Sequence, residues 1–151
     1  MIYGDPFVFA IQYDVVEVWN ENKNFWKNGL FFIYIGGEKL GLVDVVELKT
    51  TIGFYKRCGG AEVEFCEDNL EFREIYNAGM SRFYGDDIGV PGSVGDLTCT
   101  AFGDCGLFLF YAKTQKSDVL VWGGTGAEDV KGKIFPLGTI ASVLQELPGD
   151  I

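Results

Sequence analysis

The chain has 151 residues, a formal net charge of −10 and 48% hydrophobic residues, and it contains no histidine. This length predicts one domain with a sizeable core, and the hydrophobic content excludes a disordered chain. The acidic balance disfavours nucleic acid and anionic membranes as partners and favours a basic protein. Without histidine, the chain cannot build a Ser-His-Asp or Cys-His catalytic set or an imidazole zinc site.

The apolar run over residues 7–13 follows a turn signal, Gly4-Asp5-Pro6, that includes no lysine or arginine. A secretion signal needs such a basic start, and Gln12 and Asp14 keep the run far short of the roughly 20 apolar residues that span a bilayer. We therefore expect a soluble, cytoplasmic protein whose first strand covers residues 7–18. Its buried face would carry Phe7, Phe9, Ile11, Tyr13 and Val15.

Strands over residues 30–35 and 38–42 follow, joined by the hairpin signal Gly36-Gly37. Helical spacing of apolar residues then predicts a helix from residue 43 until Cys58-Gly59-Gly60 ends it. Alternation predicts a short strand over residues 61–66.

The second half of the chain begins with a helix from the cap Asp68-Asn69 to about Tyr84. Three β-like runs follow, over residues 97–102, 107–113 and 119–122. A glycine-rich loop over residues 123–133 and a last helix over residues 138–147 complete the chain. We predict a single α+β domain over residues 1–151, in the order βββ-α-(β)-α-βββ-α. Short turns between consecutive strands imply a mainly antiparallel sheet with helices packed on it.

The four cysteines, Cys58, Cys66, Cys99 and Cys105, lack the C-x2-C spacing of a zinc or redox site. An even number permits two disulfides. In a chain without an export signal, we expect buried thiols instead. We expect no cofactor and no metal.

Acidic residues are concentrated between residues 61 and 87, where only Arg73 and Arg82 oppose them. The acids are Glu62, Glu64, Glu67, Asp68, Glu71, Glu74, Asp86 and Asp87. They form either a solvated helix face or a docking surface for a basic protein, whose association the charge would accelerate. The pair Asp86-Asp87 also leaves open a metal-dependent enzyme.

Three large aromatic residues, Trp19, Phe25 and Trp26, lie in or beside the polar loop over residues 20–28. Such residues are enriched in binding interfaces, but they more often close the edge of a core. We interpret them as core lids, with an interface as the alternative.

The chain start Met1-Ile2-Tyr3-Gly4-Asp5-Pro6, followed by the strand Phe9-Ala10-Ile11-Gln12-Tyr13-Asp14, resembles the immunity protein 42 family of bacterial polymorphic-toxin systems. Some members belong to contact-dependent growth inhibition systems. The resemblance continues through Gly36-Gly37, Tyr84-Gly85-Asp86-Asp87, the strand over 106–111 and the C-terminal helix. Residues 61–70 depart from the family pattern, as expected of a surface that recognises one cognate toxin.

The resemblance implies a cytoplasmic immunity protein that binds the C-terminal domain of its toxin and neutralises it stoichiometrically. The acidic balance fits a basic toxin, such as a nuclease. We expect no enzymatic activity. The toxin-binding candidates are the eight acids between residues 62 and 87. The alternative to an immunity protein is an acidic protein-binding adaptor unrelated to toxins. A metal-dependent enzyme is the third hypothesis.

Overall fold

The computed structural model describes residues 1–20, 25–40, 45–85, 94–126 and 129–151. Within these residues the chain is α+β with antiparallel sheets, as predicted, and it has four α-helices. The chain divides into two compact units. Unit 1 holds Met1–Gly60 and Ala141–Ile151, and unit 2 holds Ala61–Ile140. The assignment of residues 1–151 to one domain stays a prediction.

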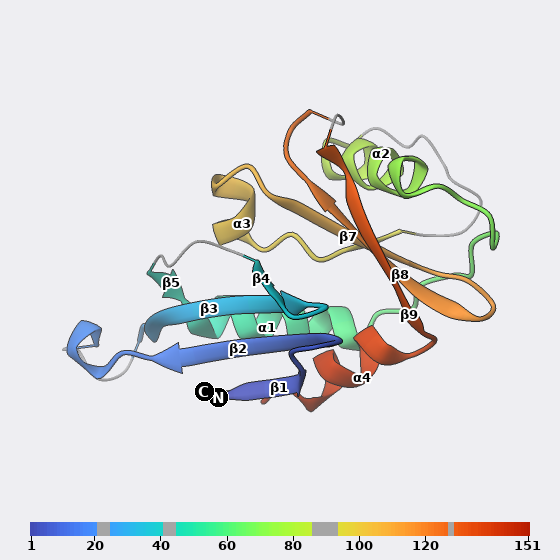
Figure 1. Cartoon of the computed structure of the whole chain (residues 1–151). Helices are drawn as coiled ribbons and strands as arrows, with labels where there is room; N and C mark the ends of the chain where they lie inside the picture. The colour runs from blue at the N-terminus through green and yellow to red at the C-terminus, as the bar shows by residue number, and fades with distance from the viewer. Residues whose placement is uncertain (21–24, 41–44, 86–93, 127–128) are drawn as a thin grey trace. The chain divides into compact units, whose positions relative to one another are not determined.

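Unit 1 is built on an antiparallel sheet in the order β1-β2-β3-β4, with β5 also paired to β3. Helix α1 packs on this sheet (Figure 1). The elements are β1 (Ile2–Asp5), β2 (Phe9–Val15), the 3-10 helix η1 (Glu17–Trp19), β3 (Asn28–Ile35), β4 (Glu38–Leu40), β5 (Val46–Glu47) and α1 (Leu48–Gly60). The predicted hairpin turn is confirmed: Gly36 and Gly37 join β3 to β4 with φ of 59° and 88°, which glycine adopts without strain.

The register of β2 and β3 sets the core of unit 1. Apolar residues at alternating positions face one another across the two strands and are all buried, in the pairs Phe9–Ile35, Ile11–Ile33 and Tyr13–Phe31. From α1, the ring of Tyr55 stacks on Phe31 with the centroids 5.2 Å apart. Alternation with period two therefore determines which face of the sheet receives the helix.

Unit 2 is built on a second antiparallel sheet, in the order β6-β7-β8-β9, with α2 packed on β7 and β8. Its elements are α2 (Phe72–Phe83), β6 (Gly95–Asp96), α3 (Thr100–Asp104), β7 (Phe108–Lys113), β8 (Ser117–Gly123) and β9 (Lys131–Pro136). The last helix, α4 (Thr139–Glu146), starts in unit 2 and continues in unit 1. The buried carboxylate of Asp118 accepts a hydrogen bond from the backbone N–H of Ile140 at 2.9 Å, which fixes the first turn of α4.

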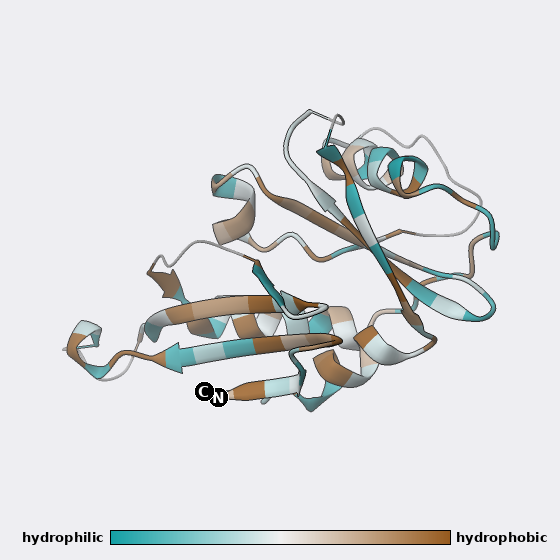
Figure 2. Ribbon diagram, viewed as in Figure 1, coloured by the Kyte–Doolittle hydropathy of each residue, from teal (hydrophilic) through white to brown (hydrophobic). Residues whose placement is uncertain are grey.

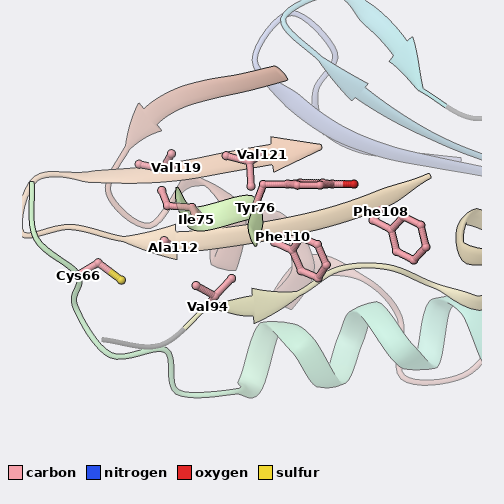
Figure 3. Packing of buried hydrophobic residues seen from close by; sticks show 9 residues of the cluster. All are labelled: Cys66, Ile75, Tyr76, Val94, Phe108, Phe110, Ala112, Val119 and Val121. Atoms are coloured by element: carbon pink, nitrogen blue, oxygen red, sulfur yellow. The ribbon is translucent and has the colours of Figure 1, made fainter. Parts of the chain in front are cut away.

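The core of unit 2 lies between α2 and the facing side of β7 and β8 (Figure 3). Figure 2 shows the apolar character of β7, in keeping with its burial. The ring of Tyr76 meets that of Phe110 edge to face, 5.6 Å between centroids. A Cβ atom at Gly79 would lie 2.2 Å from the Phe110 ring, so α2 approaches β7 only because position 79 has no side chain. The cluster comprises Cys66, Ile75, Tyr76, Val94, Phe108, Phe110, Ala112, Val119 and Val121.

Two predictions for the second half of the chain are wrong. Residues 97–102 do not form a strand. The backbone ladder to β7 ends with the hydrogen bond from the Leu97 N–H to the Leu109 carbonyl, at 2.9 Å. The hydroxyl of Thr98 then accepts from the Leu109 N–H at 2.9 Å and donates to the same carbonyl at 3.1 Å, and the chain turns into α3. The glycine-rich loop expected over residues 123–133 is too long, because β9 begins at Lys131 and pairs with β8.

The first half also differs from the prediction at three places. The helix expected from residue 43 begins only at Leu48, because Val46 and Glu47 form β5 and pair with β3. The opening residues form β1, which pairs with β2, and Phe7 lies in the turn between them with 82% of its surface exposed. The carboxylate of Asp5 accepts a hydrogen bond from the N–H of Phe7 at 2.9 Å, which directs the ring away from the core. The strand expected over residues 61–66 is reduced to one parallel bridge between Phe65 and Lys113.

The cysteines are buried only in part. Cys66 and Cys99 are buried as expected, whereas Cys58 is half-buried and Cys105 is exposed. No helix within the described residues is long and apolar enough to cross a bilayer.

Candidate functional site

We call residues 62–74 of unit 2 the acidic segment. It leads from the end of α1 into the first turn of α2. The backbone N–H of Cys66 donates to the carbonyl of Lys113 at 2.6 Å, which fastens the middle of the segment to the end of β7. The Cys66 side chain is buried there, and all six acids are exposed: Glu62, Glu64, Glu67, Asp68, Glu71 and Glu74. The structure therefore presents these carboxylates to solvent from one short stretch of chain.

The charge of the acidic segment belongs to a wider imbalance in unit 2. Unit 2 contains 13 acidic and six basic residues, whereas unit 1 contains nine and six. Of the two arginines near the segment, Arg73 is exposed, and Arg82 donates to the carbonyl of Val94 at 2.9 Å. The field around unit 2 is therefore negative and attracts cationic groups of a partner.

Two of the six acids also begin α2. The N-cap is Glu71 rather than the predicted Asp68 or Asn69. Glu71 and Glu74 form a capping box, in which the Glu74 carboxylate accepts a hydrogen bond from the Glu71 N–H at 2.8 Å. Substituting either residue would disturb the helix as well as any binding surface. Glu62, Glu67 and Asp68 precede the helix and are better positions for testing binding.

A shallow hollow of about 460 Å³ lies beside the N-terminus of α2. Its wall is largely apolar, with one acid and one base, and is formed by Leu70, Glu71, Phe72, Arg73 and Val130. The Phe72 ring rests on β9, where a Cβ atom at Gly132 would lie 2.4 Å from it. An apolar wall next to exposed carboxylates suits the aliphatic stem and charged tip of a lysine or arginine side chain.

Asp86 and Asp87 lie outside the described residues, so their part in the site stays a prediction, as does the metal-dependent alternative. The preceding Tyr84 is 63% exposed and ends α2. Tyr84 also lines a second hollow of about 340 Å³, together with Phe83 and Phe108. Within the described residues, no group of three or more Cys, Asp or Glu side chains could hold a metal ion.

The thiol beside the acidic segment is not prepared for nucleophilic chemistry. Burial raises the pKa of Cys66, which disfavours the thiolate, the reactive form of a cysteine.

The interpretation of three aromatic residues as core lids is wrong. Trp19, Phe25 and Trp26 are 41, 79 and 60% exposed. Val18, which precedes Trp19, and Val45, which precedes β5, are also exposed, by 76 and 59%. A polar loop that contains several bulky apolar residues was the signal for this exposure.

Comparisons with known proteins agree on one family and one fold. The model of a family described as immunity protein 42 matches residues 1–149. The crystal structure of CdiI from Burkholderia dolosa AUO158 is similar to this chain with a TM-score of 0.77 and 19% sequence identity, over 97% of each chain. At that identity the likeness shows a shared fold. No curated protein matches the chain.

Proposed function

The chain belongs to the immunity protein 42 family, and from this premise we propose that it binds the C-terminal domain of its cognate toxin and neutralises it in the cytoplasm. Binding is stoichiometric: one molecule of this protein occupies one toxin domain and blocks it without chemical turnover. The acidic segment is the proposed contact surface, and the toxin domain is basic, as nucleases commonly are.

The observation that carries this proposal is the exposure of six carboxylates within 13 residues of unit 2. Charges at the rim of an interface accelerate encounter with an oppositely charged partner and help to select the correct one. An acidic surface can also occupy the region where a nuclease would bind the phosphates of its substrate. The hollow beside α2 supports the same view, because its apolar wall accepts the stem of a cationic side chain.

The test is binding and protection with the toxin encoded next to this protein. The purified toxin domain is titrated with the wild-type protein and with Glu67→Lys/Asp68→Lys, which avoids the capping box. The matched control is Glu38→Lys/Glu146→Lys, which makes the same change in net charge at exposed acids of unit 1. We expect the association rate constant of the first variant to fall at least about 10-fold and to depend less on salt concentration. The association rate constant of the control should fall much less.

Each outcome decides a separate point. If the wild-type protein forms no complex and leaves the toxin active, the proposed function is wrong. If both charge-reversal variants weaken binding equally, net charge alone matters and the acidic segment is not the contact surface.

A further inference from the structure

Five exposed apolar residues gather at one end of the sheet of unit 1, and we call them the aromatic surface: Val18, Trp19, Phe25, Trp26 and Val45. The chain leaves β2 at Val15 and continues directly into η1, which carries the first two. It enters β3 at Asn28, directly after the next two. Val45 adjoins β5, whose Val46 pairs with Gly29 at the start of β3. Three separate stretches of chain therefore bring apolar side chains to the same end of the sheet.

The backbone beneath the aromatic surface is held by a polar clamp centred on Asn20. Its side-chain oxygen accepts from the N–H of Asn28 at 2.7 Å, and its amide nitrogen donates to the carbonyls of Val16 at 2.8 Å and Asn28 at 3.0 Å. One side chain thus satisfies the backbone groups where β2 ends and β3 begins. The side-chain amide of Asn28 also donates to the Trp19 carbonyl, at 3.4 Å. The clamp fixes the backbone where β2 ends and β3 begins, so these residues lose little conformational entropy when a partner binds.

The aromatic surface has the composition of the centre of a binding interface. Its five side chains expose roughly 500 Å², comparable to the largest apolar patch on a typical monomer, and such patches often mark interaction sites. A standard protein interface takes about 800 Å² from each partner, so this surface could form the centre of one. Tryptophan is the residue most enriched at positions that dominate binding energy.

The chemistry of the aromatic surface also indicates which partner it fits. The faces of tryptophan and phenylalanine rings attract guanidinium and ammonium groups and pack against their aliphatic stems. Glu17, in the first turn of η1, adds an exposed carboxylate next to Val18. Phe25 and Trp26 lie edge to face, 5.9 Å between centroids, and offer rings in two orientations. These features complement an apolar and basic protein surface.

We propose that the aromatic surface is a second contact site for the toxin domain, which rests on the proposed function, and that it binds an arginine- or lysine-bearing patch of that domain. The aromatic surface supplies the buried anchors that slow dissociation. The acidic segment supplies the charges that speed association. The two sites therefore affect different rate constants of one complex.

The test measures the affinity of the full-length protein for the toxin domain, together with both rate constants, for Trp26→Ala and Phe25→Ala. Phe7→Ala is the matched control, because Phe7 is an equally exposed aromatic residue at the opposite end of β2. We expect each of the two variants to bind about 10- to 100-fold more weakly, mainly through faster dissociation and with an unchanged salt dependence. Phe7→Ala should bind within about 2-fold of the wild type. Circular dichroism of each variant checks that it remains folded.

The results separate this inference from the function on which it rests. If the wild type binds the toxin and both aromatic variants bind it as tightly as the wild type does, the aromatic surface is not a contact, although the proposed function holds. If the wild type does not bind at all, the proposed function itself fails. If light scattering shows a dimer of the wild type that Trp26→Ala converts to a monomer without loss of toxin affinity, the surface binds a second copy of this chain and the proposal is overturned.

Discussion

Unit 1 and unit 2 share one core arrangement but have different surfaces. Each has an antiparallel sheet with one long helix against it, and each joins helix to sheet through an aromatic pair: Phe31–Tyr55 in unit 1 and Tyr76–Phe110 in unit 2. Outside these cores they diverge. Unit 2 carries the acidic segment and an excess of seven acids, whereas unit 1 carries the aromatic surface and an excess of three. The core arrangement therefore does not determine the chemistry that each unit offers to a partner.

The largest expected effect tests whether the two cores are equivalent. Phe31 and Phe110 are 3 and 1% exposed, and each contacts an aromatic residue of the helix on its sheet. Removing a buried ring leaves a cavity, so Phe31→Ala and Phe110→Ala should each lower the free energy of unfolding by about 3–5 kcal/mol. Urea denaturation followed by fluorescence and circular dichroism measures both. A cost below about 1 kcal/mol for one variant alone would show that its unit is not packed around the aromatic pair.

An intermediate effect distinguishes the units by their buried tyrosines. Burial, followed by the neighbouring Tyr3 hydroxyl, raises the pKa of Tyr13 in unit 1 to about 12, while burial raises the pKa of Tyr76 in unit 2 by less. The folded protein thus holds the Tyr13 proton more tightly than the unfolded chain does. Its contribution to stability is complete below pH 10 and is lost as the pH rises towards 12, by about 2–3 kcal/mol.

Unfolding free energies measured from pH 8 to pH 11.5 test this difference. Tyr13→Phe should flatten the alkaline decline more than Tyr76→Phe does. An unchanged slope in Tyr13→Phe would contradict the environment described for that hydroxyl.

The smallest expected effect compares the glutamates that start α1 and α2. In unit 1, Glu47 accepts hydrogen bonds from the N–H groups of Lys27, Lys49 and Thr50, at 3.2, 3.1 and 2.6 Å. In unit 2, Glu74 accepts one from Glu71. Glu47→Ala should therefore cost about 1 kcal/mol of unfolding free energy, and Glu74→Ala about 0.5 kcal/mol.

The contribution of Glu47 to the free energy of unfolding should also depend on pH. Burial alone would raise the pKa of Glu47, but the hydrogen bonds from Thr50, Lys27 and Lys49 outweigh it, so the pKa is lowered. The stabilisation is present above the ordinary pKa of glutamate and is lost as the pH falls through the lowered value. Thermal unfolding at pH 7 and pH 3 measures this, and the stability difference between the wild type and Glu47→Ala should shrink at the lower pH.

Local patterns in the sequence were sufficient where neighbouring residues decide the structure. The alternation from Phe9 to Tyr13 identifies β2, Gly36-Gly37 identifies the hairpin, and the apolar stripe from Ile75 onward identifies α2. The sequence was insufficient where a distant partner decides. β9 forms because it pairs with β8 through backbone hydrogen bonds, although Gly132 and the lysines on either side of it predict a loop. α3 replaces a strand because the Thr98 hydroxyl, in place of a backbone carbonyl, accepts from the Leu109 N–H.

The same distinction holds for the candidate sites. The exposure of the acidic segment could be predicted, because carboxylates rarely lie buried without a partner. The capping role of Glu71 depended on the helix beginning at Phe72 rather than earlier. The polar loop around Trp19 and Trp26 hinted at their exposure but did not decide it, because the same residues would be buried if another element covered that end of the sheet.

The exposed edge residues of β9 affect the tendency of this protein to aggregate while it has no partner bound. β9 is the last strand of its sheet among the described residues, and an end strand can recruit strands from other molecules and start aggregation. Exposed Lys131 and Lys133 place charge on that edge, and Pro136 has no N–H to offer an incoming strand. These side chains therefore make the β9 edge a poor template for strand addition by another copy of this chain.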